Sequence, residues 1–186
     1  MSRIYYATEF TGLHAGTTLI SIGLVTDDDK EFYAELTDYD DSQIDDWIQE
    51  HVLDNLLFNE FETVSKQLGN ITFVKGTSEE VGIQLQAWLR TFNHVELWSD
   101  VCHYDMVLFQ GLFGGVSGVP GNVDYICYDI ATVFKMFGID PGISREAFID
   151  KPIEGVKHNA LHDAKVIRAC YDKLQRNRDM YRVVLK

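Results

Sequence analysis

The sequence predicts one α/β domain over residues 1–186, built on a mixed β-sheet in which an antiparallel meander is joined by parallel strands and flanked by helices. Three observations support this fold class. Residues 4–36 contain three apolar runs typical of strands, separated by short polar turns. The rest of the chain alternates helical apolar spacing with short apolar runs. The length fits one ordinary domain, and the chain shows neither an internal repeat nor a linker.

Three strands are expected near the N-terminus. Residues 4–10 form a β-branched and aromatic run, residues 17–26 form a longer apolar run, and residues 31–36 alternate polar with apolar side chains. The turn between the last two is rich in aspartate. Consecutive strands joined by short turns can pair directly, so these three are expected to form the antiparallel meander.

The middle of the chain gives a weaker pattern. A helix is expected to begin at Ser42, because four apolar residues share one face of it: Ile44, Trp47, Ile48 and Val52. Residues 53–76 are expected to be irregular, with one short helix over residues 61–68. A clearer helix follows, since Thr77 and Glu80 form a capping-box pattern ahead of a helical stripe made of Val81, Leu85, Trp88, Leu89 and Phe92.

The C-terminal half alternates short strands with helices. The predicted elements are a strand over 95–99, a helix over 104–113, a glycine-rich loop over 114–122, a strand over 123–127, a helix over 129–137 and a turn over 140–142. The last helix begins near Ala160, and its inner face is expected to carry Leu161, Ala164, Ile167, Tyr171 and Leu174.

The net charge disfavours one class of nucleic-acid binding. The chain has 16 Lys and Arg against 29 Asp and Glu, which gives a formal charge of −13. Proteins that grip long duplexes neutralise many phosphates with a basic face, and this chain offers acidic runs instead. Such runs are typical of solvated turns. A site that holds only the last few nucleotides needs few phosphate contacts and remains compatible with this charge.

The expected location is the cytoplasm, with no membrane partner. No apolar run approaches the roughly 20 residues that span a bilayer, and the N-terminus lacks a cationic segment followed by an apolar one. The three cysteines, Cys102, Cys127 and Cys170, are widely spaced and form no CxxC pair. They are therefore expected to be reduced thiols rather than parts of a disulfide framework or a zinc knuckle.

Two carboxylates occupy positions where strands end. Glu9 lies near the end of the first strand, before a glycine turn, and strand alternation places Ala7 on the same face. Asp105 follows the strand 95–99 through a short polar turn and falls in the first turn of a helix. Taken singly, Glu9 is compatible with an ordinary strand-end glutamate and Asp105 with a partner of the helix dipole.

A third candidate stretch opens the last helix. Asp163 projects about one turn on from Asn159, and His158 just before the helix can reach the same site. An unperturbed histidine titrates near pH 6.5, which suits it to accept a proton from water. The alternative is that His158 only caps the helix and that Asp163 is solvated. The loop over 114–122 lacks the GxxxxGK[ST] and GxGxxG patterns, so it is not expected to hold phosphate.

Together these stretches resemble the DEDDh branch of the RNase H-like 3′-5′ exonucleases over most of the chain. Residues 9–13 (EFTGL) resemble the first motif of that family, Asp105 the second, and residues 158–163 (HNALHD) the third. The segments TLISIGLV, WSDVCHYD and HNALHDA are most similar to bacterial and phage 3′-5′ exoribonuclease-like proteins, which are relatives of oligoribonuclease. The resemblance implies an RNase H-like sheet and release of nucleoside monophosphates from the 3′ end of single-stranded or short RNA or DNA.

The resemblance also implies roles for individual residues. Glu9, Asp105 and Asp163 would hold two Mg²⁺ or Mn²⁺ ions together with an aspartate at position 7, and His158 would be the general base. Five residues are implied to contact substrate: Phe10 and Leu13 against the terminal base, Thr11 and Gly12 through backbone amides, and Tyr104 by stacking. Trp98 is expected to pack in the core. A homodimer is possible, because dimers are common in the family.

One position departs from the family pattern. The first motif has Asp-x-Glu, and this chain has Ala7 where that aspartate belongs. Two explanations follow: an engineered inactive form, or a natural pseudoenzyme that binds nucleotides or nucleic acid without cutting. The presence of Glu9, Asp105, His158 and Asp163 favours the first, because a decaying site rarely keeps every other part. No motif distinguishes RNA from DNA.

Overall fold

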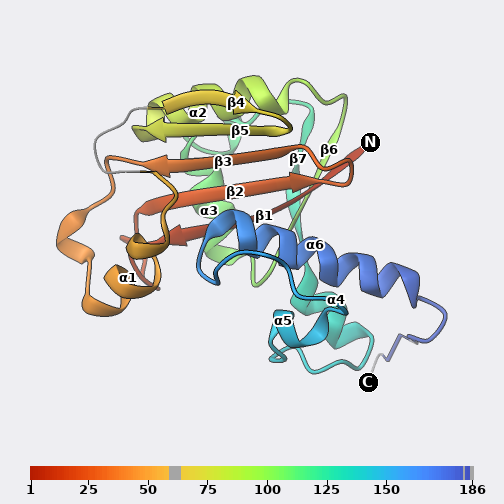
Figure 1. Cartoon of the computed structure of the whole chain (residues 1–186). Coiled ribbons are helices and arrows are strands. Elements are labelled where there is room, and N and C mark those ends of the chain that lie inside the picture. The colour runs from red at the N-terminus through yellow and green to blue at the C-terminus, as the bar shows by residue number, and fades with distance from the viewer. Residues whose placement is uncertain (59–63, 182, 185–186) are drawn as a thin grey trace.

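A computed structural model of the chain shows a seven-stranded mixed sheet with helices on both faces (Figure 1). The structure describes residues 1–58, 64–181 and 183–184. The strands are β1 (Ser2–Phe10), β2 (Leu19–Thr26), β3 (Glu31–Leu36), β4 (Val64–Leu68), β5 (Ile71–Gly76), β6 (Val95–Ser99) and β7 (Val123–Asp129). Their order across the sheet is β4-β5-β3-β2-β1-β6-β7.

The predicted meander and the parallel strands are both confirmed. β1 pairs antiparallel with β2, and β2 pairs antiparallel with β3. On the other side of β1, β6 and β7 run parallel to it. This arrangement places β1 at the centre of the sheet, where its buried residues Ile4, Tyr5 and Tyr6 are fully excluded from solvent.

Helices divide between the two faces of the sheet. The helices are α1 (Asp46–His51), α2 (Ser78–Leu89), α3 (His103–Gly111), α4 (Ile130–Met136), α5 (Arg145–Phe148) and α6 (Ala160–Arg176). Apolar residues of α2 and α3 form one core with β1, β2 and β3, while α4, α5 and α6 form a second core on the opposite face. Figure 1 shows α6 lying across the sheet, with α1 beside the C-terminal end of β1.

Residues 53–76 differ from the prediction. A 3₁₀ turn over Leu53–Asn55 is followed by β4 and β5, which extend the sheet, whereas an irregular segment was expected. The helix predicted over 61–68 is wrong for residues 64–68, and residues 61–63 lie outside the described part of the chain. β4 is an edge strand with polar side chains (VSKQL), so its local pattern carries no apolar strand signal.

Two smaller differences concern helix starts. The helix expected from Ser42 begins at Asp46, because the Asp45 side chain accepts a hydrogen bond from the Ile48 amide and caps the helix there. Residues 41–43 instead form a separate 3₁₀ turn. The short helix α5 was not predicted, although Ser144 caps it through the Ala147 amide. The Thr77–Glu80 capping box of α2 is confirmed.

The described residues contain no helix long and apolar enough to cross a membrane. Cys102, Cys127 and Cys170 are all free, as predicted.

Candidate active site

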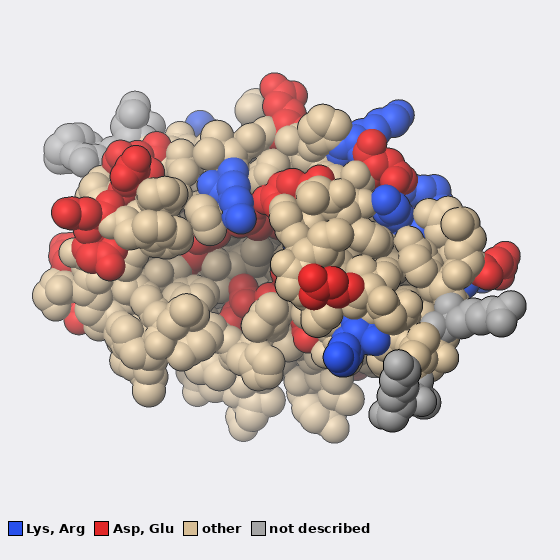
Figure 2. Space-filling view, turned by 90° about the horizontal axis from the view of Figure 1, so that it is seen from below, with Lys and Arg blue, Asp and Glu red and all other residues tan. Residues whose placement is uncertain are grey.

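The candidate site is a cleft of about 1020 Å³ at the carboxyl end of β1. Its lining comes from β1 and the turn after it, from α1, from the start of α3, from residues 141–146 and from the start of α6. Ligands in open α/β sheets bind where neighbouring strands separate at their carboxyl ends. Figure 2 shows acidic side chains in the hollow of this face of the molecule.

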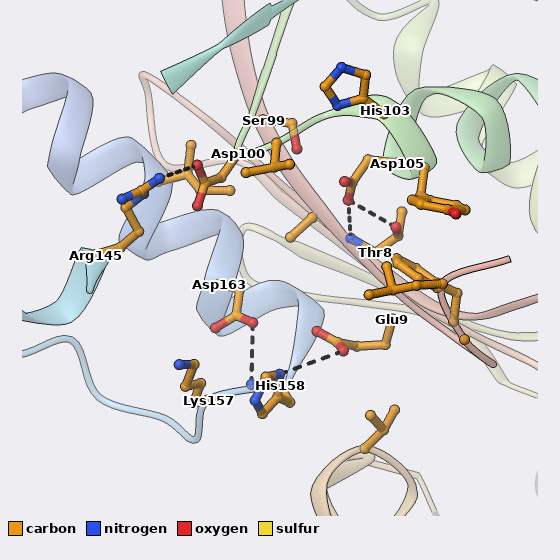
Figure 3. A pocket seen from close by; sticks show the side chains of 18 of the residues that line it. Thr8, Glu9, Ser99, Asp100, His103, Asp105, Arg145, Lys157, His158 and Asp163 are labelled. Atoms are coloured by element: carbon orange, nitrogen blue, oxygen red, sulfur yellow. Dashed lines mark hydrogen bonds and ion pairs between the residues drawn. The ribbon is translucent and has the colours of Figure 1, made fainter. Parts of the chain in front are cut away.

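The cleft forms because β1 and β6 separate. Their parallel pairing ends at Tyr5 and Trp98, and β1 continues to Phe10. The backbone N–H of Thr8 is thereby left without a strand partner on that side. It donates instead to Asp105 Oδ1 at 2.9 Å, and the Thr8 hydroxyl donates to the same oxygen at 2.9 Å. Asp105 lies in the first turn of α3, as the sequence predicted, and these two hydrogen bonds fix it against β1 (Figure 3).

Glu9 faces the start of α6. One ligand atom each from Glu9, His158 and Asp163 lies within 4.8 Å of the others, and His158 Nδ1 is 4.0 Å from Glu9 Oε2. Figure 3 shows the Glu9 and Asp163 carboxylates side by side, each joined to His158 by a dashed line. Three of the four predicted catalytic side chains therefore meet at one point, and Asp105 lines the same cleft.

The turn that carries His158 is held in a conformation that L-residues rarely adopt. His158 has φ +64°, in the left-handed region. Its backbone N–H donates to Asp163 Oδ2 at 3.2 Å, while the Asn159 side chain accepts from the Leu161 and His162 amides and caps α6. The cap and the Asp163 contact together hold the His158 ring over the cleft.

Burial and mutual repulsion disfavour ionisation of these carboxylates in the protein alone. Burial raises the pKa of Asp105 to about 6. Burial, together with the neighbouring carboxylates, raises the pKa of Glu9 far above its ordinary value. Asp163, which is hydrogen-bonded to Glu9, also has a raised pKa, chiefly because of burial. A divalent cation would relieve this repulsion, and carboxylate oxygens are the donors that Mg²⁺ and Mn²⁺ prefer, so the residues present fit such an ion.

Ala7, the residue that departs from the family pattern, lies in the cleft. Ala7 lines the cleft on the same face of β1 as Glu9 and is 8% exposed. An aspartate there would add a carboxylate beside the Glu9–Asp163 pair. Asp100, which could have substituted for it, is instead paired with Arg145 through a 2.7 Å contact.

The predicted substrate residues divide into two groups. Phe10 stacks on Tyr104 with ring centroids 5.4 Å apart, and Leu13 is 79% exposed at the rim. Thr11 is different, because it is 2% exposed and its backbone N–H donates to Thr18 O at 3.0 Å. The Thr11 amide that was predicted to reach a nucleotide is therefore used inside the β1–β2 turn. Gly12 lines the cleft with φ +152°.

Trp47 lines the cleft and was not among the predicted site residues, and neither was His51 beside it. Trp47 was predicted to share one helix face with other apolar residues, and it is 50% exposed. Its ring stacks on His51 at 4.7 Å and meets the His158 ring edge-on at 5.1 Å. The four-residue spacing of Trp47 and His51 was the available signal, because it places both rings on one helix face. Trp98 packs against Tyr128 and Tyr171, as predicted for a core residue.

Comparisons with known proteins agree with this geometry. The family model described as "3'-5' exoribonuclease Rv2179c-like domain" matches residues 2–174. Two curated relatives from Mycobacterium tuberculosis are each 28% identical over 165 residues, covering 88% of this chain and 87% of the relative: 3'-5' exoribonuclease Rv2179c of strain H37Rv and 3'-5' exoribonuclease MT2234.1 of strain CDC 1551.

Solved structures are similar in fold. A full-length 3'-exonuclease aligns with a TM-score of 0.64 at 12% identity, over 98% of this chain and 84% of its own. The Pan2 catalytic unit of Neurospora crassa, which comprises a protease and a nuclease domain, aligns with a TM-score of 0.56 at 13% identity, over 96% of this chain and 28% of its own. At these identities the likeness concerns the fold, and it confirms the predicted RNase H-like mixed sheet.

Proposed function

Because the chain belongs to the Rv2179c-like 3′-5′ exoribonuclease domain family, we propose that its cleft binds the 3′ end of a short or single-stranded RNA and that, with an aspartate at position 7, the same site would perform metal-dependent removal of the terminal nucleotide. In that reaction water attacks the last phosphodiester, the bond to the 3′ oxygen of the preceding nucleotide breaks, and a nucleoside 5′-monophosphate leaves. The observation that carries the proposal is the convergence of Glu9, Asp105 and Asp163 with His158 in one cleft.

Glu9, Asp105 and Asp163 are the proposed ligands of Mg²⁺ or Mn²⁺. When bound, such ions lower the pKa of water and stabilise negative charge on the phosphoryl oxygens. The carboxylates are preorganised for this by their own contacts: Asp105 by Thr8, and Asp163 by the His158 backbone N–H. A fixed arrangement of charge is effective because it needs no reorganisation during the reaction.

His158 is the proposed general base. Burial, then the neighbouring Lys157 and His51, lower the pKa of its imidazole. The ring is therefore neutral near pH 7 and able to accept a proton from the attacking water. The imidazole lies next to the Glu9 and Asp163 carboxylates, beside the point where the ions would bind.

Aromatic side chains on two sides of the cleft provide the proposed base contacts. Phe10 and Tyr104 form a stacked pair on one side, and Trp47 and His51 form another. Stacking on aromatic rings is tolerant of sequence and contributes about 1–3 kcal/mol per base. Leu13, at the rim, is positioned to contact the terminal base. Such contacts account for binding without the basic face that this chain lacks.

We propose further that Ala7 leaves the chain able to bind an RNA 3′ end and unable to cut it. The alternative is a natural binding protein of the same fold, in which the remaining site residues serve binding alone. Restoring the carboxylate distinguishes them. Ala7→Asp should gain Mn²⁺-dependent cleavage of a labelled RNA oligomer, whereas Ala7→Asn, of nearly equal size, should not. Failure of the Ala7→Asp protein at every metal concentration, while it still binds RNA, would favour the binding protein.

A further inference from the structure

A buried glutamate on β3 fixes the segment that follows α1. Glu35 is fully buried, and its Oε1 accepts from the Tyr33 hydroxyl at 3.0 Å. The same oxygen accepts from the backbone N–H groups of Leu57 at 2.6 Å and Phe58 at 3.1 Å. Its other oxygen lies 3.7 Å from Lys75 Nζ. The carboxylate thus ties this segment to the sheet through groups that would otherwise be costly to bury.

Asn159 joins this cluster from the start of α6. Its Oδ1 accepts from the Leu161 and His162 amides at 3.2 Å each and caps α6. Its Nδ2 donates to the Tyr33 hydroxyl at 3.4 Å and to the Asn55 carbonyl at 3.1 Å. The two ends of one amide therefore serve different purposes: the oxygen caps a helix, and the nitrogen binds two partners outside it.

The Asn55 contact extends the connection to α1. Asn55 Nδ2 donates to the carbonyl of His51, the last residue of α1, at 2.6 Å. His158 immediately precedes Asn159 in the chain. Its own backbone lies in the left-handed region, next to the residue that contacts Asn55. The rings of Trp47 and His158, carried by the two connected segments, meet at 5.1 Å.

We propose that Asn159 is a positioning residue that couples the Trp47–His51 helix to the His158 turn through its side-chain N–H groups. Its consequence for catalysis rests on the proposed function, while the coupling itself is a property of the chain as it stands. An N-cap alone would be served by Ser, Thr or Asp. Asparagine adds two N–H donors to the capping oxygen, and both are used here.

Two variants distinguish the role of the Asn159 capping oxygen from the role of its side-chain N–H donors. Asn159→Ser keeps a capping oxygen and removes both donors, and Tyr33→Phe removes one of the two acceptors. Asn122 offers a matched control, because its Nδ2 also bridges two carbonyls, those of Leu89 at 2.9 Å and Phe92 at 2.8 Å, and it does not line the cleft. Asn122→Ser removes an equivalent bridge without touching α1 or the His158 turn.

The first measurement is the proton NMR contact between the Trp47 and His158 rings in the unmodified Ala7 background. Asn159→Ser should weaken this contact and shift the His158 ring resonances, Tyr33→Phe should do so to a smaller extent, and Asn122→Ser should leave both unchanged. A folded Asn159→Ser protein with unaltered ring contact would overturn the proposal. If Asn159→Ser does not fold, an unaltered contact in Tyr33→Phe would overturn it instead.

The second measurement is steady-state kinetics in the Ala7→Asp background. Asn159→Ser should lower kcat by about 10- to 100-fold, the range expected when a catalytic group is misplaced by about 1 Å, with a smaller change in KM. Asn122→Ser should keep kcat. A fall in kcat with an intact ring contact would contradict the coupling. If Ala7→Asp itself does not cut, the proposed function fails, and the NMR result still decides the coupling.

Discussion

The two walls of the cleft differ in how they are supported. Glu9, Asp105 and Asp163 project from β1, α3 and α6, which pack into the two large cores of the domain. Trp47 and His51 project from a six-residue helix whose own core consists of Ile20, Ile48 and Val52, with four partly buried neighbours. The acidic wall is therefore fixed by the main body of the fold. The aromatic wall is held by a small apolar cluster and a few hydrogen bonds, so under the proposed function we expect it to adjust more than the acidic wall when RNA binds.

This difference predicts that the acidic wall controls turnover. In the Ala7→Asp background, Asp163→Asn should lower the cleavage rate by about 10³-fold, because it removes a carboxylate that, under the proposed function, would bind the ions. RNA affinity in the presence of EDTA should change little. Single-turnover cleavage and filter binding measure the two quantities. Equal losses of rate and affinity would assign Asp163 to substrate binding instead.

The aromatic wall should control affinity. Trp47→Ala should weaken RNA binding by about 10-fold, which corresponds to about 1.4 kcal/mol and lies within the range for one stacked base. The melting temperature should hardly move, because the ring is half exposed. Trp88→Ala is the matched control: that ring packs on Phe32 in the core, so its loss should lower stability and spare affinity. An unchanged affinity in Trp47→Ala would remove this residue from the RNA site.

The acidic wall should also make stability depend on pH when metal is absent. The pKa of Asp105 rises from an ordinary 3.8 to about 6 on burial, so its protonated form favours folding. The contribution of Asp105 to the free energy of unfolding is full below pH 4 and is lost as the pH rises through about 6. Mn²⁺ should therefore raise the melting temperature more at pH 8 than at pH 5, by a few degrees.

The matched variant for that experiment is Asp105→Asn, which cannot ionise and should flatten the pH dependence measured in EDTA. The same Mn²⁺ effect at both pH values, or an undiminished pH dependence in Asp105→Asn, would show that burial does not raise the pKa of Asp105 as described.

Sequence reasoning succeeded where local pattern and tertiary structure agree. β1 is central and buried, so its β-branched and aromatic run identified it, and the HNALHD segment placed His158 and Asp163 correctly at the start of α6. The contact between Thr8 and Asp105 could not be predicted, because it depends on where β1 and β6 separate.

The wrong predictions also concern residues whose placement depends on tertiary structure. β4 is polar and lies at the sheet edge, so nothing in its own sequence demands burial. Trp47 was grouped with the apolar residues on one face of a helix that was expected to begin four residues earlier, at Ser42. Asp45 caps the helix instead, and the buried face then consists of Ile48 and neighbouring Val52. The family resemblance implied that the Thr11 backbone N–H contacts a nucleotide, yet this N–H donates to Thr18 O inside the β1–β2 turn.

The most direct test of the central claim follows the products of the Ala7→Asp protein on one RNA heptamer labelled at its 5′ end, with Mn²⁺ present. The proposed function predicts a ladder that shortens by one nucleotide at a time from the 3′ end, released nucleoside 5′-monophosphates, and no ladder from Ala7→Asn. Internal cuts, removal of nucleotides from the 5′ end, or an equal ladder from Ala7→Asn would contradict it.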